Sequence, residues 1–272
     1  MSDPVVYDGA DLPPVARTAV LHLPGIDAHH LLSAHAKVAV LGPVDQPIAA
    51  AVAVPTSGGW SVDTSAREPG RDLTLATTLA ARLPGEDPVH LWLSTSTPGL
   101  AAAADDGRLP VRTVLELRVP LPLDPPRINV RPFRPMDDAE SWVRVNNRAF
   151  AWHPEQGGWT QEDLARHTAE AWFDPRGFLI HEVDGVLAGF CWTKIHREPE
   201  VLGEIYAIGV DPDFQGRGLG RQLTLAGFNH LHERGMPTGM LWVEDDNDAA
   251  RALYADLGMR EHGRRRALVL KR

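Results

Sequence analysis

The sequence predicts an α/β (α+β) protein made of two halves of one fold, each a mixed central sheet flanked by helices. Strand-like apolar runs alternate with segments of helical period, which is the order expected for this class. A short pattern also occurs twice. Val62-Asp63 is followed by Leu73-Thr74-Leu75-Ala76, and Val210-Asp211 is followed by Leu223-Thr224-Leu225-Ala226. Matches that keep one order are typical of a tandem duplication.

Two further matches extend the repeat. Leu91-Trp92-Leu93 in the first half parallels Leu241-Trp242-Val243 in the second. Each half then ends in an alternating strand, Val114–Val119 in the first and Ala267–Leu270 in the second. The duplication therefore covers most of both halves.

The segment Leu121–Pro126 lies between the halves and is rich in proline, which makes it stiff and unsuited to a helix. We therefore expect this segment to be a linker. The sequence then divides into an N-terminal domain over residues 1–120, the linker over residues 121–126 and a C-terminal domain over residues 127–272.

Composition excludes several classes of protein. The chain has 272 residues, 43% of them hydrophobic, so each half can bury a core. A formal net charge of -9 argues against non-specific nucleic-acid binding. No apolar run approaches the roughly 20 residues that a membrane span needs. A single cysteine, Cys191, and an N-terminus without a signal core favour a cytoplasmic protein, which we expect to be a monomer. No Cys–His spacing suggests a metal site.

The second half is predicted to contain helices and strands in the following order. They are a strand over 129–133, helices over 137–149 and 162–172, a hairpin of 178–183 and 187–195, a strand over 204–210, a helix over 219–234, a strand over 240–243, a helix over 249–257 and two last strands within 259–270. Asp137 is expected to cap the first helix, and Gly235 and Gly258 are expected to end later ones.

The most informative segment is the glycine-rich loop Val210–Arg221, between a strand and a helix. Such a loop directs several backbone N–H groups and the positive end of the helix dipole into one concavity, which suits a pyrophosphate. A strand-to-helix turn that needs glycine only for its geometry is the alternative. The matching loop of the first half, Thr64–Asp72, has one glycine, a proline and two carboxylates. It is therefore expected to bind a pyrophosphate poorly.

The spacing Gln-x-x-Gly-x-Gly with two nearby arginines resembles the coenzyme A loop of the GNAT N-acetyltransferases. The resemblance implies tandem GNAT folds, a degenerate N-terminal domain, a catalytic C-terminal domain, acetyl-CoA as co-substrate and no metal. The cofactor contacts implied in the loop are Gln215, Gly216, Arg217, Gly218, Leu219, Gly220 and Arg221. The exposed backbone of Ile208, Gly209 and Val210 is expected to bind the pantetheine arm as another strand would.

Two residues are candidates for acid–base chemistry. Glu204 opens the strand that leads into the loop and is predicted to take the amine proton, although a solvated strand-end glutamate is the alternative. Strict alternation would put Glu204, Tyr206 and Ile208 on one face of this strand and Ile205, Ala207 and Gly209 on the other.

Tyr254 lies in a segment that resembles the GNAT pattern Ala-x-x-x-Tyr-x-x-x-Gly-Phe, in which the tyrosine is the general acid. A phenol is protonated at neutral pH and can donate. Packing of this tyrosine against the sheet is the alternative. The resemblance also implies cofactor contacts at Asn247, Ala250 and Arg251; Asn247 could equally be only a helix cap.

Three longer segments, 146–159, 189–196 and 202–212, resemble the mycothiol synthase family of two-domain GNAT enzymes. This resemblance implies acetylation of a cysteinyl amine on a glucosaminyl-inositol, a small-molecule substrate. The substrate contacts that it implies are Asp27, Glu155, Lys194, Glu204 and Trp242. Tryptophan stands at position 242 where the family more often has tyrosine, and an indole can donate a hydrogen bond but cannot accept one.

Two other functions fit the same motifs. One is a GNAT enzyme that acetylates a peptide N-terminus or an aminoglycoside, and the other is an acetyl-CoA sensor without catalysis. Glu155 and Lys194 argue against the first, and the presence of both Glu204 and Tyr254 argues against the second.

Overall fold

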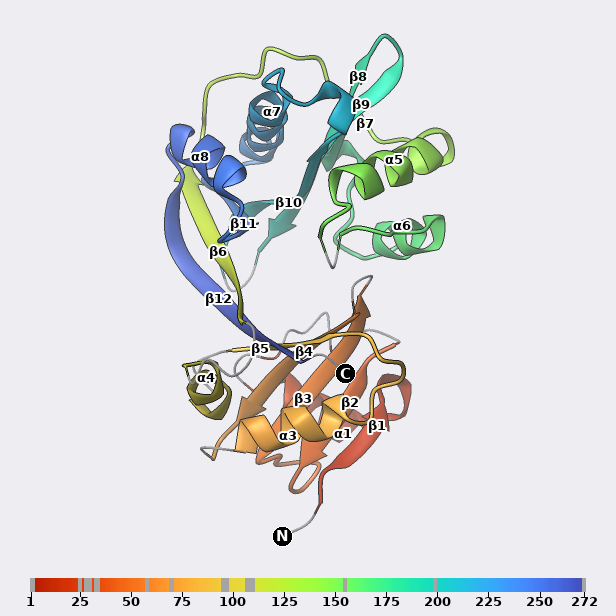
Figure 1. Ribbon diagram of the computed structural model, residues 1–272, viewed down its shortest axis with the longest axis vertical. Coiled ribbons are helices and arrows are strands. Elements are labelled where there is room, and N and C mark those ends of the chain that lie inside the picture. Colours follow the sequence, from red (N-terminus) through yellow and green to blue (C-terminus); the bar gives the residue numbers. More distant parts are fainter. Residues whose placement is uncertain are drawn as a thin grey trace. The chain divides into compact units, whose positions relative to one another are not determined.

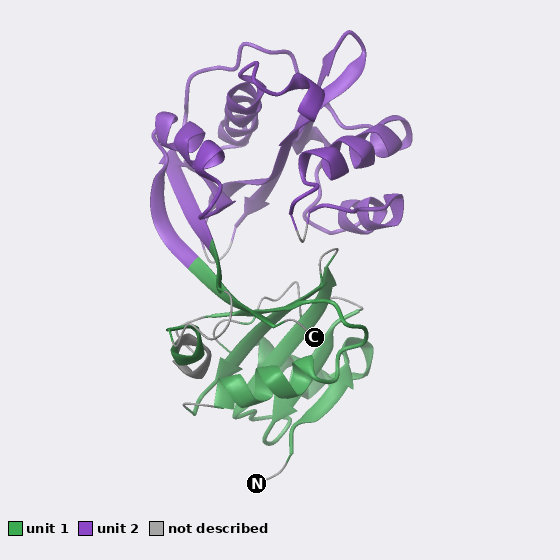
Figure 2. Ribbon diagram, viewed as in Figure 1, with its two compact units in different colours: residues 1–113, 265–272 green, residues 114–264 purple. Residues whose placement is uncertain are grey.

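The computed structural model describes residues 3–23, 26, 31, 35–56, 59–68, 71–93, 98–105, 111–153, 156–197 and 200–270. The chain forms two compact units, one of residues 1–113 with 265–272 and one of residues 114–264 (Figure 2). It passes between them inside two long strands, β6 (Val111–Pro120) and β12 (Arg260–Leu270).

The compact units differ from the predicted division into residues 1–120 and 127–272, because the last strand of each repeat pairs with the sheet of the other unit. Residues 114–120 of β6 pair antiparallel with β11 (Thr238–Glu244) in the second unit. Residues 267–270 of β12 pair antiparallel with β5 (Val89–Trp92) in the first unit. The strands that end the two sequence repeats are therefore exchanged between the units.

The proline-rich segment after β6 does not join the two units. Leu121 and Leu123 pack against a core of the second unit, and the Leu121 amide donates to the Pro237 carbonyl at 2.9 Å. The expected linker is therefore part of the second unit.

The first unit contains the sheet order β1-β2-β3-β4-β5-β12. Its other strands are β1 (Val5–Asp8), β2 (Lys37–Leu41), β3 (Ala49–Thr56) and β4 (Gly59–Ala66). Its described helices are α1 (Pro14–Leu21), α3 (Arg71–Ala80) and α4 (Pro98–Asp105). Two separate hydrophobic clusters, one containing α1 residues and one containing α3 residues, cover the sheet.

The second unit repeats this plan with the sheet order β12-β6-β11-β10-β9-β8-β7 (Figure 1). Its other strands are β7 (Arg131–Pro132), β8 (Phe178–Val183), β9 (Val186–His196) and β10 (Leu202–Val210). Its helices are α5 (Pro135–Ala149), α6 (Gln161–Thr168), α7 (Leu219–Glu233) and α8 (Asp248–Asp256). Within the described ranges, no helix is both long and apolar enough to cross a membrane.

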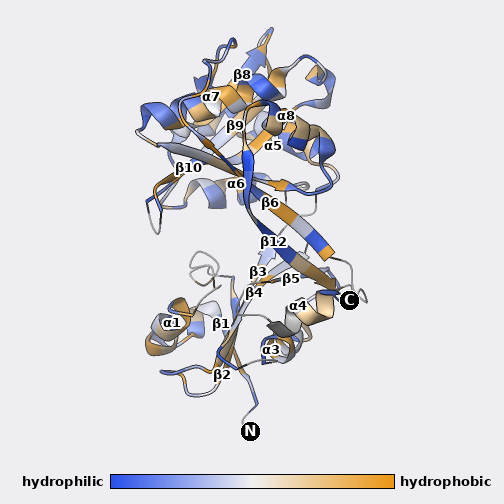
Figure 3. Cartoon of the chain, turned by 90° about the vertical axis from the view of Figure 1, so that its left-hand side faces the viewer, coloured by the Kyte–Doolittle hydropathy of each residue, from blue (hydrophilic) through white to orange (hydrophobic). Residues whose placement is uncertain are grey.

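The sheet of the second unit is covered on both faces (Figure 1). One core lies under α7 and α8 and contains Leu223, Phe228 and Leu257. The other lies under α5 and α6 and is mostly aromatic, with Trp142 and Trp192 fully buried in it. Hydrophobic residues alternate with polar ones along β6, whose apolar side chains complete the first core (Figure 3). This two-sided burial fixes the strand register of the sheet.

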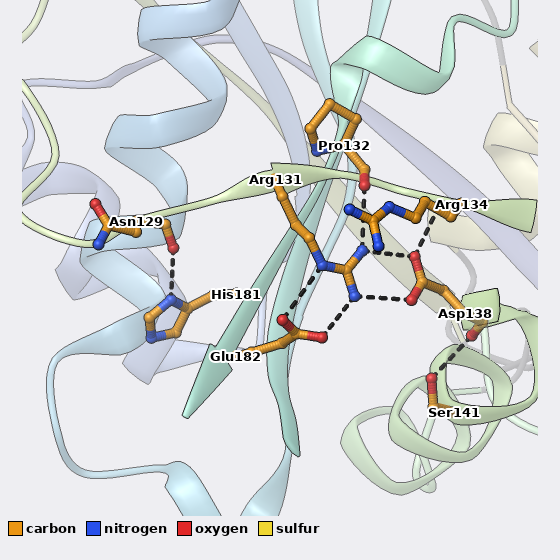
Figure 4. A network of polar contacts seen from close by, with 8 residues as sticks. All are labelled: Asn129, Arg131, Pro132, Arg134, Asp138, Ser141, His181 and Glu182. Atoms are coloured by element: carbon orange, nitrogen blue, oxygen red, sulfur yellow. Dashed lines mark hydrogen bonds and ion pairs between the residues drawn. The ribbon is translucent and has the colours of Figure 1, made fainter. Parts of the chain in front are cut away.

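A polar network ties α5 to the edge of the sheet (Figure 4). Arg131 donates to both carboxylate oxygens of Asp138, at 2.7 and 2.8 Å, and also binds Glu182 on β8. The hydrogen bonds that Arg131 donates to Asp138 and then to Glu182 raise the pKa of Arg131. α5 begins at Pro135, so Asp137 lies within its first turn, and the Arg134 amide that precedes the helix donates to Asp138. The prediction of Asp137 as the cap was wrong.

Most other elements of the second half match their predictions within a few residues. The hairpin turn Asp184-Gly185 has positive φ at both positions, 52° and 76°, as a two-residue hairpin requires. The expected strand over 129–133 is reduced to Arg131–Pro132. The expectation of two strands within 259–270 was wrong, because β12 is a single strand that serves both units.

Candidate functional site

A site forms where two parallel strands of the second unit separate. β10 and β11 pair at Gly203–Gly239, Glu204–Met240 and Ile205–Leu241. Over the described residues beyond that point the pairing stops, although β10 continues to Val210 and β11 to Glu244. The edge of β10 that faces β11 is therefore available to another extended chain from residue 206 onward.

A β-bulge marks the same place. The register between β10 and β9 shifts between Ile205 and Ala207, so that Tyr206 is the extra residue. Because of this bulge, Ile208 packs with Ile205 on the α7 side, whereas Ala207 packs on the α5 side. The strict alternation expected along β10 was therefore wrong after Tyr206.

The glycine-rich loop ends at the start of α7. Gly216 and Gly218 have φ of 73° and 77°, and Gly218 is the residue that precedes the helix. Only glycine adopts this left-handed conformation without strain, and it leaves the first amide groups of α7 uncovered. The loop thus presents N–H donors and a helix N-terminus to the same space, as an anion site requires.

A cavity of about 680 Å³ lies against this loop. Most residues predicted to contact the cofactor line it: Ile208, Gly209, Val210, Gln215, Gly216, Gly218, Leu219, Gly220, Arg221, Asn247 and Ala250. Arg217 and Arg251 do not line it. Arg217 instead donates to the Asp213 carbonyl, and Arg251 donates to the Asp245 carbonyl.

Several lining residues were not predicted. They are Ala149, Phe150 and Trp152 after α5, with Asp246, Ala249 and Leu253 around α8. Phe150 and Trp152 reach the cavity because the end of α5 packs beside β10, a contact that no local sequence pattern encodes. Trp152 is 58% exposed, so its large apolar side chain is accessible beside the cavity.

A second cavity of about 170 Å³ lies at the bulge and shares five lining residues with the first. The shared residues are Phe150, Trp152, Ile208, Asn247 and Ala250. Tyr206, Trp242 and Tyr254 also line the second cavity. Together, the two neighbouring cavities extend from the N-terminus of α7 to the point where β10 and β11 separate.

Tyr254 lies on α8 with 7% of its surface exposed. Its hydroxyl makes no hydrogen bond to any side chain or backbone group in the described part of the chain. Burial, and then the nearby Cys191 thiol, raises the pKa of Tyr254. The phenol thus keeps its proton throughout the neutral range and can donate it into the second cavity.

Asn247 has the cap role that the sequence left open, and its contact with the cofactor stays a prediction. Its side chain caps α8 by accepting the Ala250 amide at 3.1 Å, and the residue lines both cavities.

Glu204 lies outside both cavities. It is 8% exposed, and its Oε2 lies 2.6 Å from Nε2 of His196 on β9. The side chain is on the α5 and α6 face of the sheet with Lys194, whose Nζ lies 4.6 Å from the centre of the Trp172 ring. Glu204 is therefore near the second cavity along β10 but is not part of its wall.

The remaining substrate candidates are only partly described. Trp242 is 37% exposed and lines the second cavity. Asp27 and Glu155 lie outside the described residues. Within the described ranges, no group of three or more His, Cys, Asp or Glu side chains is arranged to hold a metal ion.

Comparisons with known proteins identify the family of the chain. Residues 142–259 match the acetyltransferase (GNAT) family. A mycothiol acetyltransferase of Thermomonospora curvata is 46% identical over 210 residues, which cover 74% of this chain and 69% of that protein. One of Acidothermus cellulolyticus is 39% identical over 252 residues, which cover 85% of this chain and 74% of that protein.

The fold has relatives among solved structures. A GCN5-related N-acetyltransferase from Sphaerobacter thermophilus is 21% identical, with a TM-score of 0.67. The match covers 98% of this chain and 95% of that chain, so both halves take part in it. Together with the repeated element order, this identifies tandem GNAT folds, as the sequence predicted.

Proposed function

Because this chain belongs to the mycothiol acetyltransferase family, we propose that it acetylates the cysteinyl amine of 1D-myo-inositol 2-(L-cysteinylamino)-2-deoxy-α-D-glucopyranoside, giving mycothiol and coenzyme A. The chain is an acetyl-CoA-dependent N-acetyltransferase. One observation carries the finer proposal: two neighbouring cavities with shared lining residues extend from the N-terminus of α7 to Tyr254, along the part of β10 that does not pair with β11.

Acetyl-CoA binds along these cavities in the proposal. Backbone amides of Gly216, Gly218 and Gly220 hold the diphosphate at the positive end of α7, with Arg221 adding charge. The pantetheine amides pair with the free edge of β10 at Ile208–Val210, as an added strand would. This support leads the thioester toward the second cavity.

Glu204 and Tyr254 then divide the proton transfers. The acceptor nitrogen attacks the thioester carbon, and the C–S bond breaks as the C–N bond forms. The proton lost by the nitrogen passes to Glu204, relayed by solvent since Glu204 does not line the cavity. Tyr254 gives its proton to the departing sulfur. The phenol is protonated at neutral pH, and its position in the wall of the second cavity supports this role.

The acceptor is proposed to bind on the α5 and α6 face of the sheet. Lys194 and Glu204 lie on that face, and Trp242 lines the second cavity. A lysine can donate to sugar and inositol hydroxyls, and the negative charge of Glu204 beside the cavity attracts the ammonium group before it loses its proton. Asp27 and Glu155 remain proposed contacts on the resemblance alone.

Catalysis is assigned to the second half of the chain only. Asp72 is fully buried in the first turn of α3, at the position of the first half that corresponds to the pyrophosphate loop. A fixed carboxylate there opposes binding of a diphosphate. This supports a first half without acetyl transfer.

The test is acetyl-CoA turnover with three acceptors: the cysteinyl pseudodisaccharide, an aminoglycoside and a peptide with a free N-terminus. Products are separated by chromatography, because the natural acceptor carries its own thiol. We expect turnover of the pseudodisaccharide with a kcat/KM at least about tenfold above the others. Preference for another amine would support a different GNAT enzyme, and tight acetyl-CoA binding without any turnover would support a sensor.

A further inference from the structure

Lys194 and Glu204 face each other across two strands yet do not form an ion pair. They are direct partners in the antiparallel register of β9 and β10. Opposed side chains in such a pair have Cβ atoms roughly 4.5–5.5 Å apart, and opposite charges there normally attract. Glu204 is instead bound to His196, whose position in the register is diagonal to it.

The Lys194 ammonium is held by aromatic rings. Its Nζ lies 4.6 Å from the centre of the Trp172 ring and 5.7 Å from that of Tyr206. A cation over a ring face is attracted by the negative charge of the π system. These contacts draw the lysine away from the carboxylate on the neighbouring strand.

The two rings form a fixed platform. Their centres lie 4.9 Å apart, and both contact the fully buried Trp192, at 5.7 and 5.3 Å. Tyr206 is also the bulged residue of β10 and lines the second cavity. The platform therefore links the position of Lys194 to the wall of the site.

We propose that Trp172, with Tyr206, is a positioning residue that prevents Lys194 from forming an ion pair with Glu204. The inference rests on the proposed roles of Lys194 and Glu204 in acceptor binding. An ion pair between them would neutralise the carboxylate that attracts the acceptor's ammonium group and would occupy the ammonium group of Lys194 that donates to the acceptor's hydroxyls. With the two apart, a cationic polyhydroxy acceptor can bind between them.

A double-mutant cycle tests the proposal. Without the Trp172 ring, Lys194 pairs with Glu204, so Trp172→Leu raises the KM for the acceptor about tenfold and leaves the KM for acetyl-CoA unchanged. Trp172→Phe keeps a ring face and most of the acceptor affinity. In a Lys194→Met background, Trp172→Leu has no further effect, since no lysine remains to pair. An equal effect of Trp172→Leu in both backgrounds would overturn the proposal.

A second measurement does not depend on activity. The chain has three lysines, Lys37, Lys194 and Lys271, so protein labelled with ¹³C-lysine gives few signals. We expect one ε-methylene signal to be shifted upfield by ring currents, to vanish with Lys194→Met and to return to the unshifted position in Trp172→Leu. Absence of a shifted signal in the unaltered protein would contradict the platform. If the pseudodisaccharide is not turned over but the shift is present, the proposed function fails and the platform stands.

Discussion

The Nε2 atom of His196 lies 2.6 Å from Oε2 of Glu204, and this contact holds the carboxylate at the end of β10 where the strands begin to separate. The imidazole is on β9 and the carboxylate is on β10, so their position depends on the sheet register. The contact therefore fixes the orientation of the Glu204 carboxylate relative to β9.

Glu204→Gln is expected to slow acetyl transfer about 100-fold while acetyl-CoA binding stays unchanged, because the amide cannot accept the amine proton. The loss is largest at low pH, where more of the acceptor is protonated. The measurement is kcat across the pH range, with acetyl-CoA affinity from calorimetry. His196→Gln, which keeps the carboxylate, serves as the comparison and is expected to lose less. Equal rates for Glu204→Gln and the unaltered enzyme would remove Glu204 from the mechanism.

Tyr254→Phe is expected to lower kcat about 100-fold and to leave the KM for acetyl-CoA unchanged, because only the proton donor is lost. Burial raises the pKa of Tyr254, so the donor form persists as the pH rises and the profile of the unaltered enzyme shows no loss from this group near neutrality. Tyr7→Phe in the first unit is the control. A kcat for Tyr254→Phe equal to that of the control would mean that water protonates the sulfur.

Gly218→Val is expected to weaken acetyl-CoA binding at least about tenfold, because a β-branched residue strains the left-handed conformation at φ 77° and disturbs the N-terminus of α7. Gly235→Val is the matched control. Gly235 has φ 82° just after α7 and lines neither cavity. Both variants lose stability, but only Gly218→Val changes the calorimetric Kd. A similar Kd of acetyl-CoA for the two variants would show that the loop does not bind the cofactor.

His167 on α6 is expected to make the fold acid-sensitive. Burial, and then the charge of Arg166, lowers the pKa of His167 from 6.5 to about 4. The unfolded chain therefore takes up this proton more readily than the folded one, so stability falls as the pH drops from 6.5 to 4. His167→Gln should reduce the fall in Tm across this interval, measured by thermal unfolding. If Tm falls equally with pH in His167→Gln and in the unaltered protein, the assignment to His167 is wrong.

The sequence predicted those parts of the site that depend on local chemistry. The Asp184-Gly185 turn, the glycine-rich loop and the Asn247 cap each need particular residues at consecutive positions, and each lies where expected. The hairpin of β8 and β9 followed from its turn and its alternation.

The features that were missed depend on contacts between distant segments. The bulge at Tyr206 exists only relative to the register of β9, and the exchange of the last strands depends on which sheet each one joins. Asp137 and Asp138 are adjacent acids, and only the fold shows that Asp138 is the one that meets Arg131. Phe150 and Trp152 line the cavities through packing of α5, which periodicity does not reveal.

A crystal structure of the protein with acetyl-CoA bound tests the proposed site most directly. We expect the diphosphate on the amides of Gly216–Gly220, the pantetheine along Ile208–Val210 and the sulfur within hydrogen-bonding reach of the Tyr254 hydroxyl. A diphosphate bound elsewhere, or a sulfur remote from Tyr254, would contradict this proposal.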